Sequence, residues 1–198
     1  MKHLSNTELL VLLCGDTGKA LAGKPLAELF GFTKAYEYGS LANEDRVPYM
    51  VHPAIAAAKE LYIRAIDEDM RNGISLAEGP KVVREFLCGR LAALEHEVFW
   101  CLVLDAQSRL ICIEELFRGT LTQTNVYPRE IVKTVLAHNA SGVILVHNHP
   151  SGSSAPSSAD LLLTTRIKEV LSGVDVRLLD HFVVGGNVAT SFAEQGLL

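Results

Sequence analysis

GVILVHNHPSGSSAPSSADLLLTTRIKEVLSG, residues 142–173, contains the parts of an α/β unit in order. Its apolar run VILV predicts a strand buried on both faces. A polar loop follows, and the segment from Leu161 has the apolar spacing of a helix that Gly173 ends. Because ligands in α/β folds bind outside the carboxyl ends of strands, we expect a functional site in the loop at residues 147–160.

The segments before this unit continue the α/β pattern. VFWCLVLD at 98–105 and RLICIEELF at 109–117 predict a β-hairpin with a turn at residues 106–108. The alternating threonines of residues 120–126 predict a further strand, and Pro128 suits the first turn of a helix that continues through EIVKTVLAHN. KVVREFLCGRLAALE, residues 81–95, predicts a helix ahead of the hairpin.

The N-terminal part has a helical pattern from Ser5 to about Ile74. The sequence S-N-T-E before LLVLL is a capping-box signature, and HPAIAAAKELYIRAID has apolar residues at helical spacing. NGISLAEGP, residues 72–80, has the composition of a linker. We therefore expect a boundary near Pro80, with a small all-α domain at 1–78 and an α/β domain at 79–198.

Composition excludes several classes of protein. The chain has 198 residues, of which 48% are hydrophobic and 21% charged, and no segment resembles a membrane span or a cleavable signal peptide, so we expect a cytoplasmic protein. Its four cysteines include no C-x-x-C pair, which argues against a disulfide framework or a thiolate zinc knuckle. The net charge of -5 comes without the clustered basic residues that usually accompany nucleic-acid binding.

The polar loop contains a possible metal site. His147 and His149 are two residues apart, so both imidazoles share one face if the strand continues through them. Asp160, at the start of the next helix, could complete a tetrahedral zinc site whose fourth position holds water. Two neutral imidazoles and one carboxylate leave Zn²⁺ enough positive charge to lower the pKa of that water towards about 7. This pattern predicts hydrolysis by metal-activated water.

The same residues resemble a known motif. H-N-H-P-S-G followed by P-S-S-A-D resembles the JAMM (MPN-plus) metalloprotease motif, with Ser157 and Asp160 in register. ELFRGTL, YPREIV and LLDHFVVG, which begin at residues 115, 127 and 178, further resemble the bacterial RadC family. The resemblance covers residues 97–198 closely. It implies an α/β fold of JAMM/MPN type, a cytidine-deaminase-like mixed sheet flanked by helices.

The resemblance also implies roles for individual residues. The zinc ligands would be His147, His149 and Asp160, and Ser157 would help to stabilise the oxyanion. A glutamate at the opening of the first strand would be the general base; Glu97 fits that register best, and Glu95 is the alternative. The implied reaction is cleavage of a peptide or isopeptide bond, and the family name implies an association with DNA repair.

LSNTELLVLLCGD, residues 4–16, resembles the helical region that precedes the catalytic domain in RadC proteins. The family has a helix-hairpin-helix there, with a glycine-containing turn. This chain reads VPYMVHPAIAAAKELYIR at residues 47–64, without a glycine. Glycines in such turns let backbone amides approach DNA phosphates, so the sequence gives only weak support for DNA as a partner.

Other interpretations of these residues remain open. S-x-x-D before an apolar helix is also a capping box, so Ser157 and Asp160 have a possible structural role. Asp180 and His181 either support the site or form a buried hydrogen bond. For Glu114 and Glu115, on the second strand of the hairpin, a solvated or structural role fits as well as a role as general base. Phe99 and Trp100 suit the core.

Three functional alternatives follow from these interpretations. One is a non-catalytic DNA- or protein-binding module with a structural or vacant metal site. Another is a metal-dependent nuclease. In the third, the N-terminal helices recruit a partner while the second domain cleaves. Neither the oligomeric state nor the identity of the substrate follows from the sequence.

Overall fold

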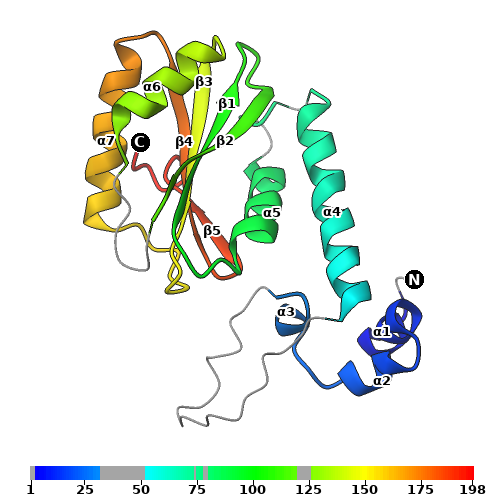
Figure 1. Cartoon of the computed structure of the whole chain (residues 1–198). Helices are drawn as coiled ribbons and strands as arrows, with labels where there is room; N and C mark the ends of the chain where they lie inside the picture. The colour runs from blue at the N-terminus through cyan, green and yellow to red at the C-terminus, as the bar shows by residue number, and fades with distance from the viewer. Residues whose placement is uncertain (1–2, 32–51, 74, 78–79, 120–125) are drawn as a thin grey trace.

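The computed structural model describes residues 3–31, 52–73, 75–77, 80–119 and 126–198, which form one sheet flanked by helices and a group of short N-terminal helices apart from it (Figure 1). The helices are α1 (Asn6–Cys14), α2 (Thr17–Leu21), α3 (Leu26–Leu29), α4 (Pro53–Arg71), α5 (Pro80–Leu91), α6 (Pro128–Ala137) and α7 (Ser158–Ser172). The strands are β1 (Val98–Leu104), β2 (Leu110–Arg118), β3 (Gly142–Asn148), β4 (Arg177–Gly185) and β5 (Val188–Ser191).

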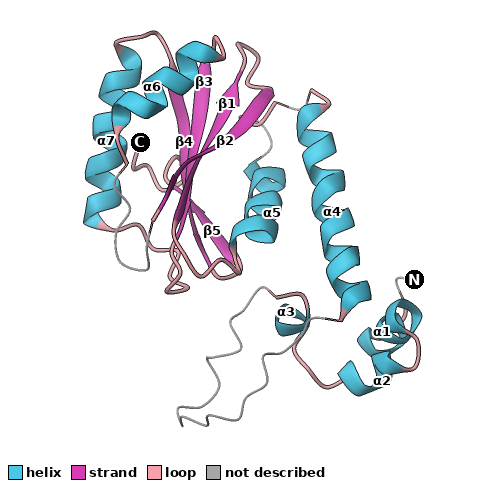
Figure 2. Cartoon of the chain, viewed as in Figure 1, coloured by secondary structure: helices cyan, strands magenta, loops and turns pink. Residues whose placement is uncertain are grey.

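The five strands form a mixed sheet in the order β2-β1-β3-β4-β5 (Figure 2). Only β3 and β4 run parallel; the other neighbouring pairs are antiparallel. Every residue of the central strand β3 is buried, as its unbroken apolar run predicts. This sheet and its flanking helices confirm the α/β fold class.

Helices cover both faces of the sheet (Figure 1). On one face, α6 and α7 pack on a cluster that includes Phe99, Val103 and Leu145 from the strands. On the other face, α5 packs on residues that include Leu102 and Leu104. Alternate residues of β1 therefore enter opposite cores, as the period of a β-strand requires.

Helix α4 extends from a small N-terminal cluster to the core of the sheet. Its first turn contributes Ile55 to a cluster with Leu10 and Leu29. Its last turns contribute residues such as Met70 to the core under α5. The boundary expected near Pro80 falls between α4 and α5, and this core contains residues from both sides of it.

Most of the expected elements are present. The hairpin of β1 and β2 is confirmed, and Ser5 forms the predicted capping box with Glu8. The helix expected over residues 81–95 instead spans Pro80–Leu91, because the chain turns at Ala92. The strand expected at 120–126, and the first residues of the segment 47–64 that was compared with the helix-hairpin-helix, fall outside the described residues apart from Val126. The four cysteines are free thiols. Among the helices that the structure describes, none has the length and apolar composition needed to cross a membrane.

Candidate metal centre

The two histidines of the motif lie at the carboxyl end of the central strand. His147 is on β3 and only 1% exposed. His149 follows the strand, and its backbone N–H donates to the Val184 carbonyl at 2.8 Å, which continues the pairing with β4. Because the strand conformation extends through this point, both imidazoles project from the same face.

Asp160 reaches these histidines from the first turn of α7. Its Oδ1 lies 3.2 Å from His147 Nε2, its Oδ2 lies 3.5 Å from His149 Nε2, and the two Nε2 atoms are 3.0 Å apart. Ligand atoms of a tetrahedral zinc ion with bonds of about 2.0–2.1 Å are separated by about 3.3 Å. The three side chains therefore have the spacing of a zinc ligand set, and no other metal-ligating residue among those described joins them.

A hydrogen-bond chain determines which nitrogen of His147 is free. The Thr164 hydroxyl donates to the Asp160 backbone carbonyl at 2.6 Å, so it accepts from His181 Nδ1, also at 2.6 Å. His181 Nε2 then lacks a hydrogen and accepts from His147 Nδ1 at 2.9 Å. When its ring is neutral, His147 consequently presents an unprotonated Nε2 to the centre of the site.

His149 is oriented in a similar way. Its Nδ1 donates to the Ser153 carbonyl at 2.9 Å, which leaves its Nε2 without a hydrogen when the ring is neutral. Two nitrogen lone pairs and a carboxylate thus converge on one point. They repel one another unless a metal ion or a proton lies between them, and this donor set fits Zn²⁺ in chemistry as well as in spacing.

The ionisation of the site follows from the same contacts. Burial alone would raise the pKa of Asp160, but hydrogen bonds from His147 and His149 outweigh it and hold that pKa well below its usual range. The hydrogen bond to Asp160 raises the pKa of His149. Burial lowers the pKa of His181 well below 6.5, and the charge of His147, when that ring is protonated, adds to this effect. His181 is therefore a neutral acceptor for His147, and Asp160 is an anion.

Ser157 caps α7 without using its hydroxyl hydrogen. Its Oγ accepts from the Asp160 backbone N–H at 3.2 Å, while its own N–H donates to Asp160 Oδ2 at 2.7 Å. Oδ1 of the same carboxylate still faces His147. Asp160 therefore combines capping with a ligand position, and the Ser157 hydroxyl hydrogen remains available to a substrate oxygen.

Glu97 lies next to the ligand set because Asn148 holds the chain on either side of it. Asn148 Oδ1 accepts from the Val98 backbone N–H at 2.8 Å, and its Nδ2 donates to the His96 carbonyl at 3.0 Å. Among the charges that raise the pKa of His149 is that of Glu97. Asn148, between the two histidines, thus anchors the segment that carries Glu97, whose charge acts on His149.

The other carboxylates lie elsewhere. Glu95 is exposed in the bend before β1. Glu115 accepts from Arg118 at 2.7 Å and from the Trp100 indole at 3.4 Å. Glu114 faces His138 across the sheet edge at 3.5 Å. Of these four glutamates, only Glu97 is among the charges that act on His149.

Asp180 and His181 have separate roles. Asp180 accepts from the backbone N–H groups of His181 and Ala193 and from the Ser191 hydroxyl, which ties the turn after β5 to β4. That turn places Phe192 against the His181 ring, with 4.7 Å between their centroids. The hydrogen bond expected between the two residues therefore involves the His181 backbone, and its ring supports His147.

Sequence reasoning overlooked Asn148 and Thr164. Asn148 is a buried polar residue between two predicted ligands, a position that hints at a partner. Thr164 occupies the same face of α7 as Asp160, one turn further on. Neither pattern indicates which distant residue the side chain contacts.

The comparisons with known proteins agree with this geometry. Residues 77–197 match the family model described as a RadC-like JAB domain. A "UPF0758 protein" of Thiobacillus denitrificans is 47% identical over 207 residues, which cover 98% of this chain and 90% of the relative. A "UPF0758 protein" of a Janthinobacterium species is 55% identical over 202 residues, with the same coverage.

Proposed function

This chain belongs to the family of RadC-like JAB domain proteins, and on that premise we propose that it is a zinc-dependent hydrolase of peptide or isopeptide bonds. The observation that carries this proposal is the convergence of His147, His149 and Asp160, with each imidazole oriented by a hydrogen bond at its Nδ1. Family membership supports a metal-dependent hydrolase; zinc and the peptide substrate are our inference.

The three ligands would hold the ion, and the surrounding residues would transfer protons and stabilise the negative charge that develops on the substrate. A zinc ion at this position would act as a Lewis acid towards water and the substrate carbonyl. Glu97 would accept a proton from the attacking water and return it to the leaving amine. The Ser157 hydroxyl would donate to the carbonyl oxygen as negative charge develops there. Asn148 would keep Glu97 in reach of the water.

The test compares two neighbouring carboxylates in the zinc-loaded full-length protein. Glu97→Gln should keep its zinc and lose about 10²–10⁴-fold in turnover of a randomised library of quenched fluorescent peptides, because the general base is removed. Glu95→Gln is the matched control, since this exposed residue should leave turnover unchanged. His149→Ala should lose the zinc of this site and turnover together.

Other results would favour the competing functions. Loss of turnover in Glu95→Gln but not in Glu97→Gln would reassign the general base. Cleavage of a labelled DNA duplex, with no cleavage of peptides, would favour a metal-dependent nuclease. If the zinc-loaded protein cleaves neither probe but retains DNA on a filter with steep salt dependence, it is a DNA-binding module.

A further inference from the structure

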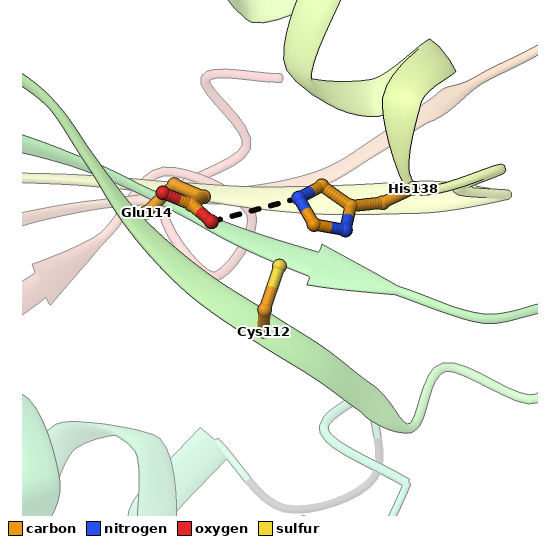
Figure 3. A group of neighbouring side chains, drawn as sticks. All are labelled: Cys112, Glu114 and His138. Carbon is orange, nitrogen blue, oxygen red and sulfur yellow. Dashed lines mark ion pairs between the residues drawn. The ribbon is translucent and has the colours of Figure 1, made fainter.

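A second group of potential metal ligands lies at the edge of the sheet. Cys112 and Glu114 are two residues apart on β2 and share one face, and His138 is the C-cap residue of α6. A sulfur, a carboxylate oxygen and a ring nitrogen from these residues all lie within 4.8 Å of one another. Figure 3 shows the three side chains directed towards a common point between the strand and the helix end.

This group is separate from the site at the end of β3. Cys112 pairs with Val103, which pairs with Val143 near the start of β3. His147 lies four residues further along that strand, or about 13 Å at the rise of a β-strand. The two groups therefore share no residue, and the proposal for one does not depend on the other.

The spacing favours an ion over a simple ion pair. Glu114 Oε1 lies 3.5 Å from His138 Nε2, long for a hydrogen bond but close to the separation of about 3.3 Å between two ligands of a tetrahedral zinc ion. Their side chains are 45% and 34% exposed, so an isolated pair would contribute little stability. Burial, the charge of Glu114 and a hydrogen bond to Glu114 raise the pKa of the Cys112 thiol, so a metal ion at this point would displace the proton that the thiol shares with the carboxylate.

The chemistry of the donors selects the ion. A thiolate and a carboxylate together neutralise a divalent cation, and the neutral imidazole adds a third bond. Sulfur and imidazole favour Zn²⁺ over Mg²⁺ or Ca²⁺, which prefer oxygen ligands. The negative end of the α6 dipole at His138 also favours a cation there.

We propose that Cys112, Glu114 and His138 bind a second zinc ion, which ties the edge strand β2 to the end of α6. Its fourth position faces solvent and is open to water, because the three ligands are only half buried. Unlike the site at His147, this one leaves the ion with no excess charge from its protein ligands. The ion is therefore a weaker activator of water than one held by His147, His149 and Asp160.

The experiment uses Co²⁺ as the probe, because a cobalt-thiolate bond gives a charge-transfer band in the near ultraviolet. The first site contains no sulfur, so only the second can produce this band. The full-length, metal-free His149→Ala protein, whose first site is disabled, should bind about one Co²⁺ with the band, and Zn²⁺ should displace it. Adding Cys112→Ser should abolish the band, whereas Cys14→Ser, the matched control, should keep it.

A second variant keeps the test valid if the Cys112→Ser protein misfolds. His138→Gln leaves Cys112 in its packing environment and should weaken Co²⁺ binding at least about tenfold, since one of three ligands is lost. Absence of the band in the His149→Ala protein would overturn the proposal. So would a band that survives Cys112→Ser, or Co²⁺ affinity unchanged by His138→Gln.

Discussion

The Thr164 hydroxyl sets the hydrogen-bond direction of the whole His181–His147 chain, because its single hydrogen is committed to the Asp160 carbonyl. Thr164→Val removes this hydroxyl and leaves a side chain of similar shape. His181 Nδ1 then loses its acceptor, and His147 loses its fixed orientation. We expect zinc affinity to fall about 10–100-fold, the usual effect of removing a partner of a metal-ligating histidine.

Competition of the protein with a zinc chelator measures this change. Thr165→Val is the matched control, because Thr165 makes a similar bond to the Leu161 carbonyl on the exposed side of the same helix. Equal zinc affinity in wild-type and Thr164→Val proteins would show that the chain does not orient His147.

Protonation of His149 should make the metal-free protein sensitive to pH. The hydrogen bond to Asp160 raises the pKa of His149 above 6.5, so the folded state holds this proton more tightly than the unfolded state. That contribution is complete below pH 6.5 and is lost as pH rises through the raised pKa. His181, whose pKa is lowered, acts in the opposite sense: its contribution grows as pH rises towards 6.5 and levels off above that value.

The Tm of protein treated with a chelator should therefore fall as pH is raised from about 6.5 to 8. The Tm increase caused by added zinc should grow over the same interval, because zinc and the proton compete for His149 Nε2. Scanning fluorimetry across this range provides the measurement. If His149→Ala without metal shows the same decline as wild type, another group is responsible.

At the scale of elements, the end of β4 packs directly against the ligand loop. A Cβ added at Gly185 would lie 2.2 Å from the backbone carbon of Ser153, whose carbonyl accepts from His149. Gly185→Ala must therefore displace this loop. We expect a loss of about 1–3 kcal/mol in unfolding free energy, as in other overpacked sites, together with weaker zinc binding.

Gly173→Ala, after α7, is the control for this substitution. An added Cβ there meets no atom closer than 3.4 Å, so stability and zinc affinity should stay near wild type. Urea unfolding measures the stability of both variants, and competition with a chelator measures their zinc affinity. A Gly185→Ala protein with undiminished zinc affinity would mean that the loop does not depend on this close packing.

The elements and the grouping of the two histidines with Asp160 were largely predictable, because both follow from local patterns. The buried run of β3, the polar loop and the spacing of His147, His149 and Asp160 are visible within one short segment. Asn148 and His181 act on residues 50 and 34 positions away, and no local pattern carries that information. The preference for Glu97 over Glu95 rested on resemblance, since both are acidic residues before the same strand.

At the scale of the whole molecule, α4 belongs to two cores. Its pattern predicts an amphipathic helix but not what each end packs against, so a boundary near Pro80 was a natural expectation. In the structure, Ile63 Cγ1 lies 2.8 Å from the position of a Cβ added at Gly89, which shows how closely α4 and α5 approach. The C-terminal half of α4 is thus part of the core beneath the sheet.

Two buried residues on α4 test this division. Met70 and Ile55 are both fully buried, the first beneath the sheet and the second in the N-terminal cluster. Trp100, the only tryptophan of the chain, lies on β1 and packs against the core that contains Met70. Its fluorescence during urea unfolding therefore reports on the stability of the sheet.

Met70→Ala should lower the unfolding free energy reported by Trp100 by about 2–5 kcal/mol, because it leaves a cavity in that core. Ile55→Ala removes a similar volume outside it and should leave the Trp100 transition and zinc affinity near wild type. Equal losses in both variants would mean that the N-terminal cluster and the sheet unfold as one cooperative unit. Unequal losses would place the cooperative boundary within α4, upstream of the linker that the sequence suggests.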